Sequence, residues 1–200
     1  MPKLLHISDS NDKLGSAGSV SLRPIADCGE NCSHCAKKCY AMKFYRARPS
    51  VRNAWDANSR AFRDADNAGD WSVLRAEIDA YLQRRRTMRF FRIHVSGDFL
   101  SQSHVDFWRS VARAHKSVKF LAFTKRFDLS FANLSPNLSI VFSMWPGMPD
   151  TAPKGPRCWV QDGTETRVPP TAIECQGSCE SCGMCWSLRK LRKDVVIHIH

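Results

Sequence analysis

A chain of 200 residues with 43% hydrophobic and 24% charged side chains has the size and balance of one globular domain, which excludes a disordered chain. The 30 Lys and Arg residues outnumber the 19 Asp and Glu residues and give a net charge of +11, which favours a polyanionic partner such as DNA, another nucleic acid or a nucleotide substrate. No apolar run has the length of a membrane span or a signal peptide, so we expect a cytoplasmic protein with no membrane partner.

The predicted elements alternate between strands and helices. In chain order we expect a strand at 19–25, helices at 51–65 and 71–84, a strand at 89–95, a helix at 103–115, strands at 118–123 and 138–142, and a last strand at 195–199. Repeated strand–helix units build parallel sheets or barrels. The chain is too short for an eightfold barrel, so the sequence predicts an α/β fold, a partial (β/α) barrel of about five to six mostly parallel strands with a C-terminal Cys-rich extension.

A change in composition after Trp145 predicts the boundary within the chain. Pro and Gly become frequent from there, as in a linker or an ordered loop. We therefore divide the chain into a partial-barrel core, 1–145, and a Cys-rich region with the closing strand, 146–200.

The nine cysteines form two groups, separated by a long stretch without any. In a reducing compartment such an excess indicates metal ligands rather than disulfides. The first group is Cys28, Cys32, Cys35 and Cys39, and the second is Cys158, Cys175, Cys179, Cys182 and Cys185. Two metal sites flanking a conventional fold are the prediction.

The first group begins with a Cys-x3-Cys-x2-Cys spacing at Cys28, Cys32 and Cys35. Three thiolates on one loop can hold three irons of a [4Fe–4S] cluster and leave the fourth iron open. The motif resembles the signature of radical S-adenosylmethionine (SAM) enzymes. That resemblance implies SAM as cofactor, chelated at the open iron, and an electron donor such as flavodoxin or ferredoxin. Because Tyr40 follows Cys39, the ligands can instead be Cys28, Cys35 and Cys39, and a four-thiolate zinc site is the structural rival.

Polar turns follow the predicted strands, where a parallel α/β fold places its ligand site. The turn Ser96-Gly97-Asp98 stands where the radical SAM family has the glycine-rich turn that receives the amino group of the cofactor. Other candidates to bind the ribose, the carboxylate or the substrate are Thr124, Lys125 and Ser143, unless they are ordinary polar strand ends. His94 precedes the turn, but a lone strand histidine is more often a core residue.

The second group contains Cys-x2-Cys-x2-Cys at Cys179, Cys182 and Cys185, a ferredoxin-like run. A fourth ligand has to come from Cys175 or Cys158. The resemblance to radical SAM enzymes implies an auxiliary [4Fe–4S] cluster for electron relay or anchoring, and zinc is the alternative.

Three further motifs resemble a group of small phage-encoded proteins with radical-enzyme-like sequences: Cys39-Tyr40-Ala41, residues 123–126 and residues 182–186. Together these resemblances imply a radical SAM enzyme, an isomerase or a modifying transferase, that acts in the host cytoplasm on a nucleic-acid base or a base-linked amino acid. The alternative is a non-catalytic zinc or iron–sulfur protein that binds nucleic acid through basic clusters such as 84–86 and 189–193. A third possibility is a degenerate radical-enzyme fold that keeps its cluster for redox sensing.

Overall fold

The computed structural model describes residues 3–199, except the side chain of residue 180. One open sheet organises this part of the chain, and all of its strands are parallel. The strands lie in the order β1-β2-β3-β4-β5-β7-β6. Their bounds are β1 Gly18–Val20, β2 Phe90–Ile93, β3 Lys119–Thr124, β4 Leu138–Met144, β5 Arg157–Gln161, β6 Ile173–Glu174 and β7 Val195–His198.

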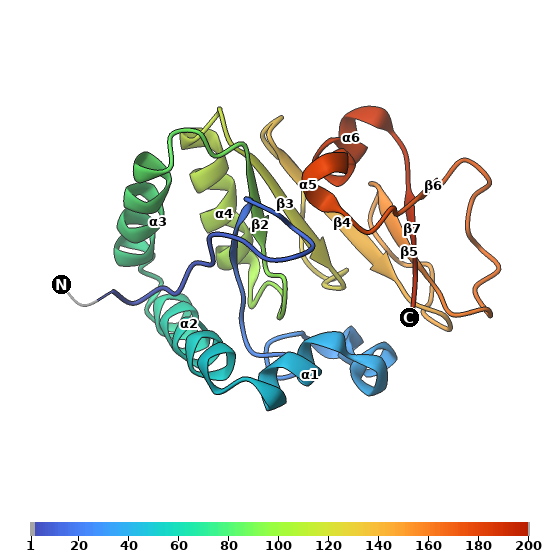
Figure 1. Ribbon diagram of the computed structural model, residues 1–200, viewed down its shortest axis with the longest axis horizontal. Helices are drawn as coiled ribbons and strands as arrows, with labels where there is room; N and C mark the ends of the chain where they lie inside the picture. The colour runs from blue at the N-terminus through green and yellow to red at the C-terminus, as the bar shows by residue number, and fades with distance from the viewer. Residues whose placement is uncertain (1–2, 200) are drawn as a thin grey trace.

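The helices connect the strands in the way that a βα repeat requires (Figure 1). Their bounds are α1 Tyr40–Ala47, α2 Pro49–Ala68, α3 Ser72–Arg84, α4 Gln102–Ala114, α5 Cys179–Cys182 and α6 Leu188–Leu191. Figure 1 shows α2, α3 and α4 on one side of the sheet and the short α5 and α6 on the other. The predicted α/β fold with an open, barrel-like parallel sheet is confirmed.

The sheet has seven strands, where the sequence analysis expected about five to six mostly parallel ones. The additional strands are β5 and β6, which lie in the region expected to be a loop leading to the second cysteine group. Strand β6 has only two residues, and β5, five residues long, follows a stretch rich in Pro and Gly that is typical of a loop, so neither was recognised from the sequence. The closing strand β7 was predicted, and it lies between them.

Alternating side chains divide the sheet into two faces. Phe91, Ile93, Phe120 and Ile140 pack in the main core under the helices. Residues on the opposite face pack in a second, smaller core with the C-terminal segment: Leu121, Val141, Cys158, Trp186, Leu188 and Val195. We call this second side the concave face. Both cysteine groups are built around this face or at its rim.

Candidate functional site

The first cysteine group lies on a loop that follows β1. The loop contains two short 3-10 turns, at Glu30–His34 and Ala36–Lys38, and then enters α1. The thiol-bearing residues Cys28, Cys32 and Cys35 are 9%, 7% and 8% exposed, and Cys39 is partly exposed. The loop packs closely enough that a Cβ on Gly29, which has φ 72°, would lie 2.5 Å from Cδ of Arg126. Three buried thiols are therefore brought together by one tight loop.

Asp27 anchors this loop to its surroundings. Its buried carboxylate accepts hydrogen bonds from the Arg23 backbone N–H, from the Ser59 hydroxyl on α2 and from the Arg63 guanidinium. Its backbone carbonyl accepts from the Asp98 N–H at 2.7 Å. The loop is thus tied both to α2 and to the turn after β2.

The turn Ser96-Gly97-Asp98 lies directly beside the loop, through the contact of Asp98 with Asp27. Gly97 has φ 80°, and a Cβ there would come within 2.6 Å of the Leu22 Cβ, so only glycine fits. The hydroxyl of Ser96 is buried and has no hydrogen-bond partner in the described part of the chain. A buried hydroxyl without a partner is costly, and at a strand end it is available to a ligand.

Asp98 links the ends of β2 and β3. Its carboxylate accepts hydrogen bonds from the Thr124 hydroxyl at 2.7 Å, from the Lys125 backbone N–H at 2.8 Å and from the Phe99 N–H at 2.8 Å. Burial raises the pKa of this carboxyl above its ordinary value, while Lys125 and the hydrogen bonds oppose the rise. Three of the predicted cofactor-binding residues therefore form one connected network.

The Lys125 side chain places a positive charge among the thiols of the first group. Burial alone would lower the pKa of Lys125, but Cys35, Asp98 and Cys28 outweigh burial and raise it. Burial also raises the pKa of the Cys28 thiol to about 12, with Cys32 adding to the rise and Lys125 opposing it. A nearby ammonium stabilises thiolates, which are the form of cysteine that binds metal.

Ser143 stands apart from that network. It pairs in register with Cys158 across β4 and β5, so both side chains lie on the concave face. The structure therefore places this predicted cofactor residue beside the second cysteine group.

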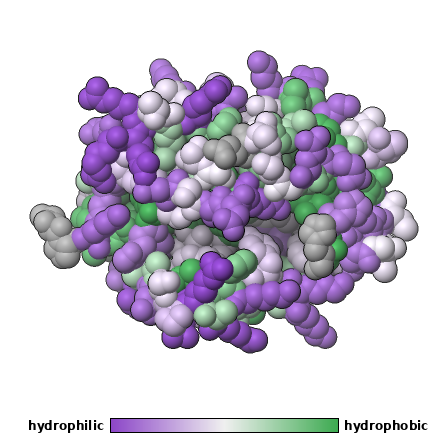
Figure 2. All heavy atoms as spheres, in the orientation of Figure 1, coloured by the Kyte–Doolittle hydropathy of each residue, from purple (hydrophilic) through white to green (hydrophobic). Residues whose placement is uncertain are grey.

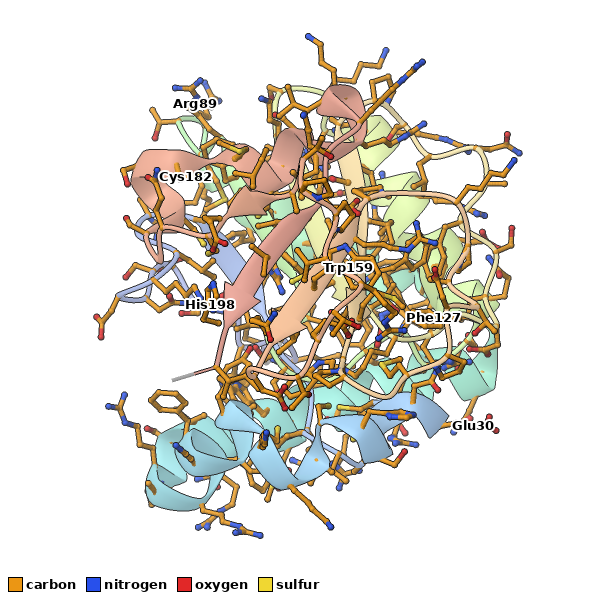
Figure 3. The ribbon with its side chains drawn as sticks, turned by 90° about the vertical axis from the view of Figure 1, so that its right-hand side faces the viewer. Glu30, Arg89, Phe127, Trp159, Cys182 and His198 are labelled. Carbon is orange, nitrogen blue, oxygen red and sulfur yellow. The ribbon has the colours of Figure 1, made fainter. Side chains whose placement is uncertain are left out.

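The second cysteine group gathers residues from three elements on the concave face. Cys158 is buried on β5, Cys175 follows β6, and the others belong to the segment of α5 and the 3-10 turn Met184–Ser187: Cys179, Cys182 and Cys185. Burial raises the pKa of Cys185 to about 12, and the neighbouring Arg92 opposes the rise while other thiols of the group add to it. Figure 3 shows Cys182 far from Glu30, so the two groups form separate sites.

Within residues 3–199, no three His, Cys, Asp or Glu side chains surround one point as the ligands of a single metal ion do. The thiolates of a four-iron cluster each bind a different iron atom, so a cluster does not require that arrangement. Groups of three or more thiols are the donors of iron–sulfur clusters and of structural zinc sites alike, so the chemistry of the residues fits either.

His94 belongs to the core and not to the site. Its Nε2 lies 3.2 Å from Nε2 of His104, and both rings pack against Phe62 under the helices. Burial lowers the pKa of His94 to about 3 and that of His104 well below its usual range. Both imidazoles are neutral at physiological pH.

Two further residues lie near the cysteine groups: Tyr40, which the sequence marked only as the neighbour of Cys39, and Arg92, which sequence reasoning did not single out. Tyr40, the first residue of α1, is 54% exposed, and its hydroxyl donates a hydrogen bond to the Val95 carbonyl. Arg92 on β2 has its guanidinium 4.1 Å from the ring centroid of Phe123. The signal for Arg92 was present in the sequence, because an arginine between apolar residues of a buried strand is unusual.

Figure 2 shows a recess in the surface, between the layer formed by α1 and α2 and the carboxyl ends of the strands. The exposed side chain of Tyr40 lies near Arg92 and also near Lys125 and Cys39, and so between the two cysteine groups. A small molecule bound against Tyr40 would lie near both Lys125 and Arg92.

Comparison with known proteins identifies relatives over most of the chain. The sequence model of a family described as gene product 88 matches residues 5–188. The Gene 88 protein of Mycobacterium phage L5 is 30% identical over 209 aligned residues, which cover 90% of this chain and 87% of the relative. The Gene 88 protein of Mycobacterium phage D29 is likewise 30% identical, with the same coverage. No solved structure matches the chain.

Helix length and hydropathy bear on the membrane prediction. None of the helices in the described residues is both long and apolar enough to cross a bilayer.

Proposed function

Since the chain belongs to the gene product 88 family, whose relatives in phages L5 and D29 share most of its length, we propose that it is a radical SAM enzyme of a phage. In this proposal Cys28, Cys32 and Cys35 hold a [4Fe–4S] cluster. The protein works in the host cytoplasm and takes electrons from a carrier such as flavodoxin or ferredoxin.

One observation carries the proposal. The loop after β1 carries three buried thiols, two of which, Cys28 and Cys35, lie near Lys125, and Asp27 joins this loop to the turn that carries Asp98. This loop stands at the carboxyl ends of parallel strands, where α/β folds bind their ligands. The unpartnered hydroxyl of Ser96 is a polar group that a bound cofactor could satisfy.

The roles of the residues follow from these contacts. Lys125 offsets the negative charge of the thiolates, and Asp98 holds the ends of β2 and β3 in register around the cofactor. When bound, the cluster and SAM would supply an organic radical able to abstract a hydrogen atom from a substrate. The second cysteine group is proposed to hold an auxiliary [4Fe–4S] cluster, or zinc, with Ser143 beside it.

The test is cleavage of SAM by the anaerobically reconstituted, dithionite-reduced full chain, measured as 5′-deoxyadenosine. We expect product from the wild type and none from Cys32→Ala, because a cluster that lacks one ligand is lost or displaced. Cys182→Ala, in the exposed part of the second group, is the matched control and should retain cleavage. A wild type that contains iron but gives no product would overturn the proposal.

A non-catalytic role in binding nucleic acid is the second candidate. Two exposed arginines of the cluster 84–86, Arg85 and Arg86, border a cavity lined also by His115 and Ser117, at the amino-terminal end of the sheet. In that case, DNA or RNA binding should persist in Cys28→Ala and fall steeply with salt.

A further inference from the structure

Arg92 is a cation on the concave face that lacks a partner. Its Nε is buried without a hydrogen-bond partner, and in the described part of the chain the side chain forms no ion pair. Other arginines near the site are paired, Arg63 with Asp27 and Arg126 with Asp128. Thiols of the second cysteine group lie near the guanidinium, but none of them hydrogen-bonds to its buried Nε, so a bound anion would satisfy a donor that the described residues leave unpaired.

The surroundings of Arg92 hold its guanidinium in a fixed position. The group lies over the ring of Phe123, with 4.1 Å between Cζ and the ring centroid. Its enclosure lowers the pKa of the guanidinium, and Tyr40 and Cys185 act in the opposite direction. Arginine stays protonated in proteins, so the guanidinium keeps its positive charge and its planar set of N–H donors for binding an anion.

Tyr40 supplies a flat apolar surface close to that charge. Its ring is 54% exposed although its hydroxyl is bound to the Val95 carbonyl. The hydroxyl contact therefore holds the ring in one orientation near Arg92 while about half of the side chain stays exposed.

We propose that Arg92 and Tyr40 bind a nucleotide in the recess between the two cysteine groups, with Arg92 at its phosphate and Tyr40 against its base. A guanidinium binds phosphate through two parallel hydrogen bonds, and aromatic rings stack on any nucleobase. The net charge of +11 favours approach of such an anion. If the bound nucleotide is the substrate of the enzyme, this inference rests on the proposed function. Binding of the nucleotide by itself requires neither SAM nor a reductant.

The experiment measures equilibrium binding of the four deoxynucleoside 5′-monophosphates, and of the matching nucleosides, to the anaerobically purified full chain without SAM. We expect at least one monophosphate to bind roughly 10- to 100-fold more tightly than its nucleoside, the usual worth of a charge-assisted contact. Arg92→Gln should remove that preference. Arg113→Gln, which removes an exposed arginine of α4 on the other side of the sheet, should keep it.

Variants of Tyr40 test the base contact. Tyr40→Leu should weaken binding of monophosphate and nucleoside alike, and Tyr40→Phe, which keeps the ring, should restore it. If Arg92→Gln does not fold, the inference is tested by two other measurements. These are the preference of the wild type for monophosphates over nucleosides and the binding by Tyr40→Leu and Tyr40→Phe. The inference is overturned if the wild type shows no preference for the monophosphates, if Arg92→Gln keeps that preference, or if inorganic phosphate competes as well as the nucleotide.

Separate samples of the wild type are assayed for SAM cleavage. Nucleotide binding without cleavage would overturn the proposed function and leave the nucleotide site standing. Cleavage without nucleotide binding would overturn the nucleotide site alone.

Discussion

Two charged residues near the carboxyl end of β2, Asp98 and Arg92, differ in whether the folded protein compensates their charge. Asp98 is buried and fully engaged by Thr124 and Lys125, so its charge is compensated inside the protein. Arg92, on β2 before that turn, has a buried Nε without a hydrogen-bond partner among the described residues. The two residues should therefore contribute differently to the free energy of unfolding, and substitutions can measure the difference.

Replacing Arg92 by methionine should stabilise the protein. The variant keeps the length of the side chain and its packing on Phe123 but removes an unpaired charge. We expect the free energy of unfolding to rise by about 1 to 2 kcal/mol, or Tm to rise by roughly 2 to 8 °C. Urea unfolding of wild type and Arg92→Met measures the change. A fall in stability would show that the guanidinium is a structural partner of the neighbouring thiols.

The buried pair His94 and His104 should make the protein sensitive to mild acid. Burial lowers the pKa of His94 from 6.5 to about 3. Between these two pH values the unfolded chain binds a proton at this histidine and the folded chain does not. Stability is therefore full above about pH 6.5 and is lost as the pH falls toward 3, by up to about 1.4 kcal/mol per pH unit for each histidine.

The measurement is urea unfolding at pH 7 and pH 5. His94→Asn, which tolerates the positive φ of 51° at this position, should show a shallower loss than the wild type. His6→Gln, at an exposed position, should lose as much stability as the wild type. Equal slopes for all three proteins would contradict the assignment.

At the scale of elements, Asp27 determines how the first cysteine loop is held. Its carboxylate joins the loop to Ser59 and Arg63 of α2. Asp27→Ala leaves a buried hydroxyl and a guanidinium without their acceptor, and we expect a loss of about 3 kcal/mol in the free energy of unfolding. Glu30→Ala, an exposed change on the same loop, should be nearly neutral. A loss of less than about 1 kcal/mol for Asp27→Ala would show that the loop is anchored by other contacts.

The helices and strands that the sequence predicted well are those in which apolar residues recur at a regular spacing. Helix α4 and strands β2, β3 and β4 fall within a few residues of the expected ranges, because apolar side chains recur at their helical or alternating spacing. Helix α1 was missed, since it is short and only one of its residues is buried. Strands β5 and β6 were missed because tertiary pairing, and not local pattern, makes them strands.

The candidate site, too, could be predicted only where its residues lie close together in the sequence. Spacing identified the two cysteine groups and the turn at Ser96-Gly97-Asp98, since these are contiguous in the sequence. It could not show that Ser143 lies beside Cys158, which depends on strand register. Nor could it bring Tyr40 and Arg92 into one region, because that requires the loop to fold back over β2.

For the whole molecule, the C-terminal segment closes one end of the concave face. Trp186 packs on Phe90, with 4.8 Å between ring centroids, and its indole N–H donates to the Phe91 carbonyl at 3.2 Å. These contacts bring Cys179, Cys182 and Cys185 onto the face that Cys158 already occupies. The second group thus depends on docking of the segment, while the first depends on the loop after β1.

Because the two groups are built by different elements, their metal contents should vary independently. In the wild type we expect roughly eight irons per chain, the content of two four-iron clusters. Cys28→Ala combined with Cys35→Ala should leave about half of that iron, and Cys179→Ala combined with Cys185→Ala should leave the other half. Iron, sulfide and zinc analysis with dithionite-reduced EPR spectra measures this, and only the second pair should retain a spectrum that SAM perturbs. Loss of all iron in either pair would contradict independent sites, and one zinc with about four irons in the wild type would assign zinc to the second group.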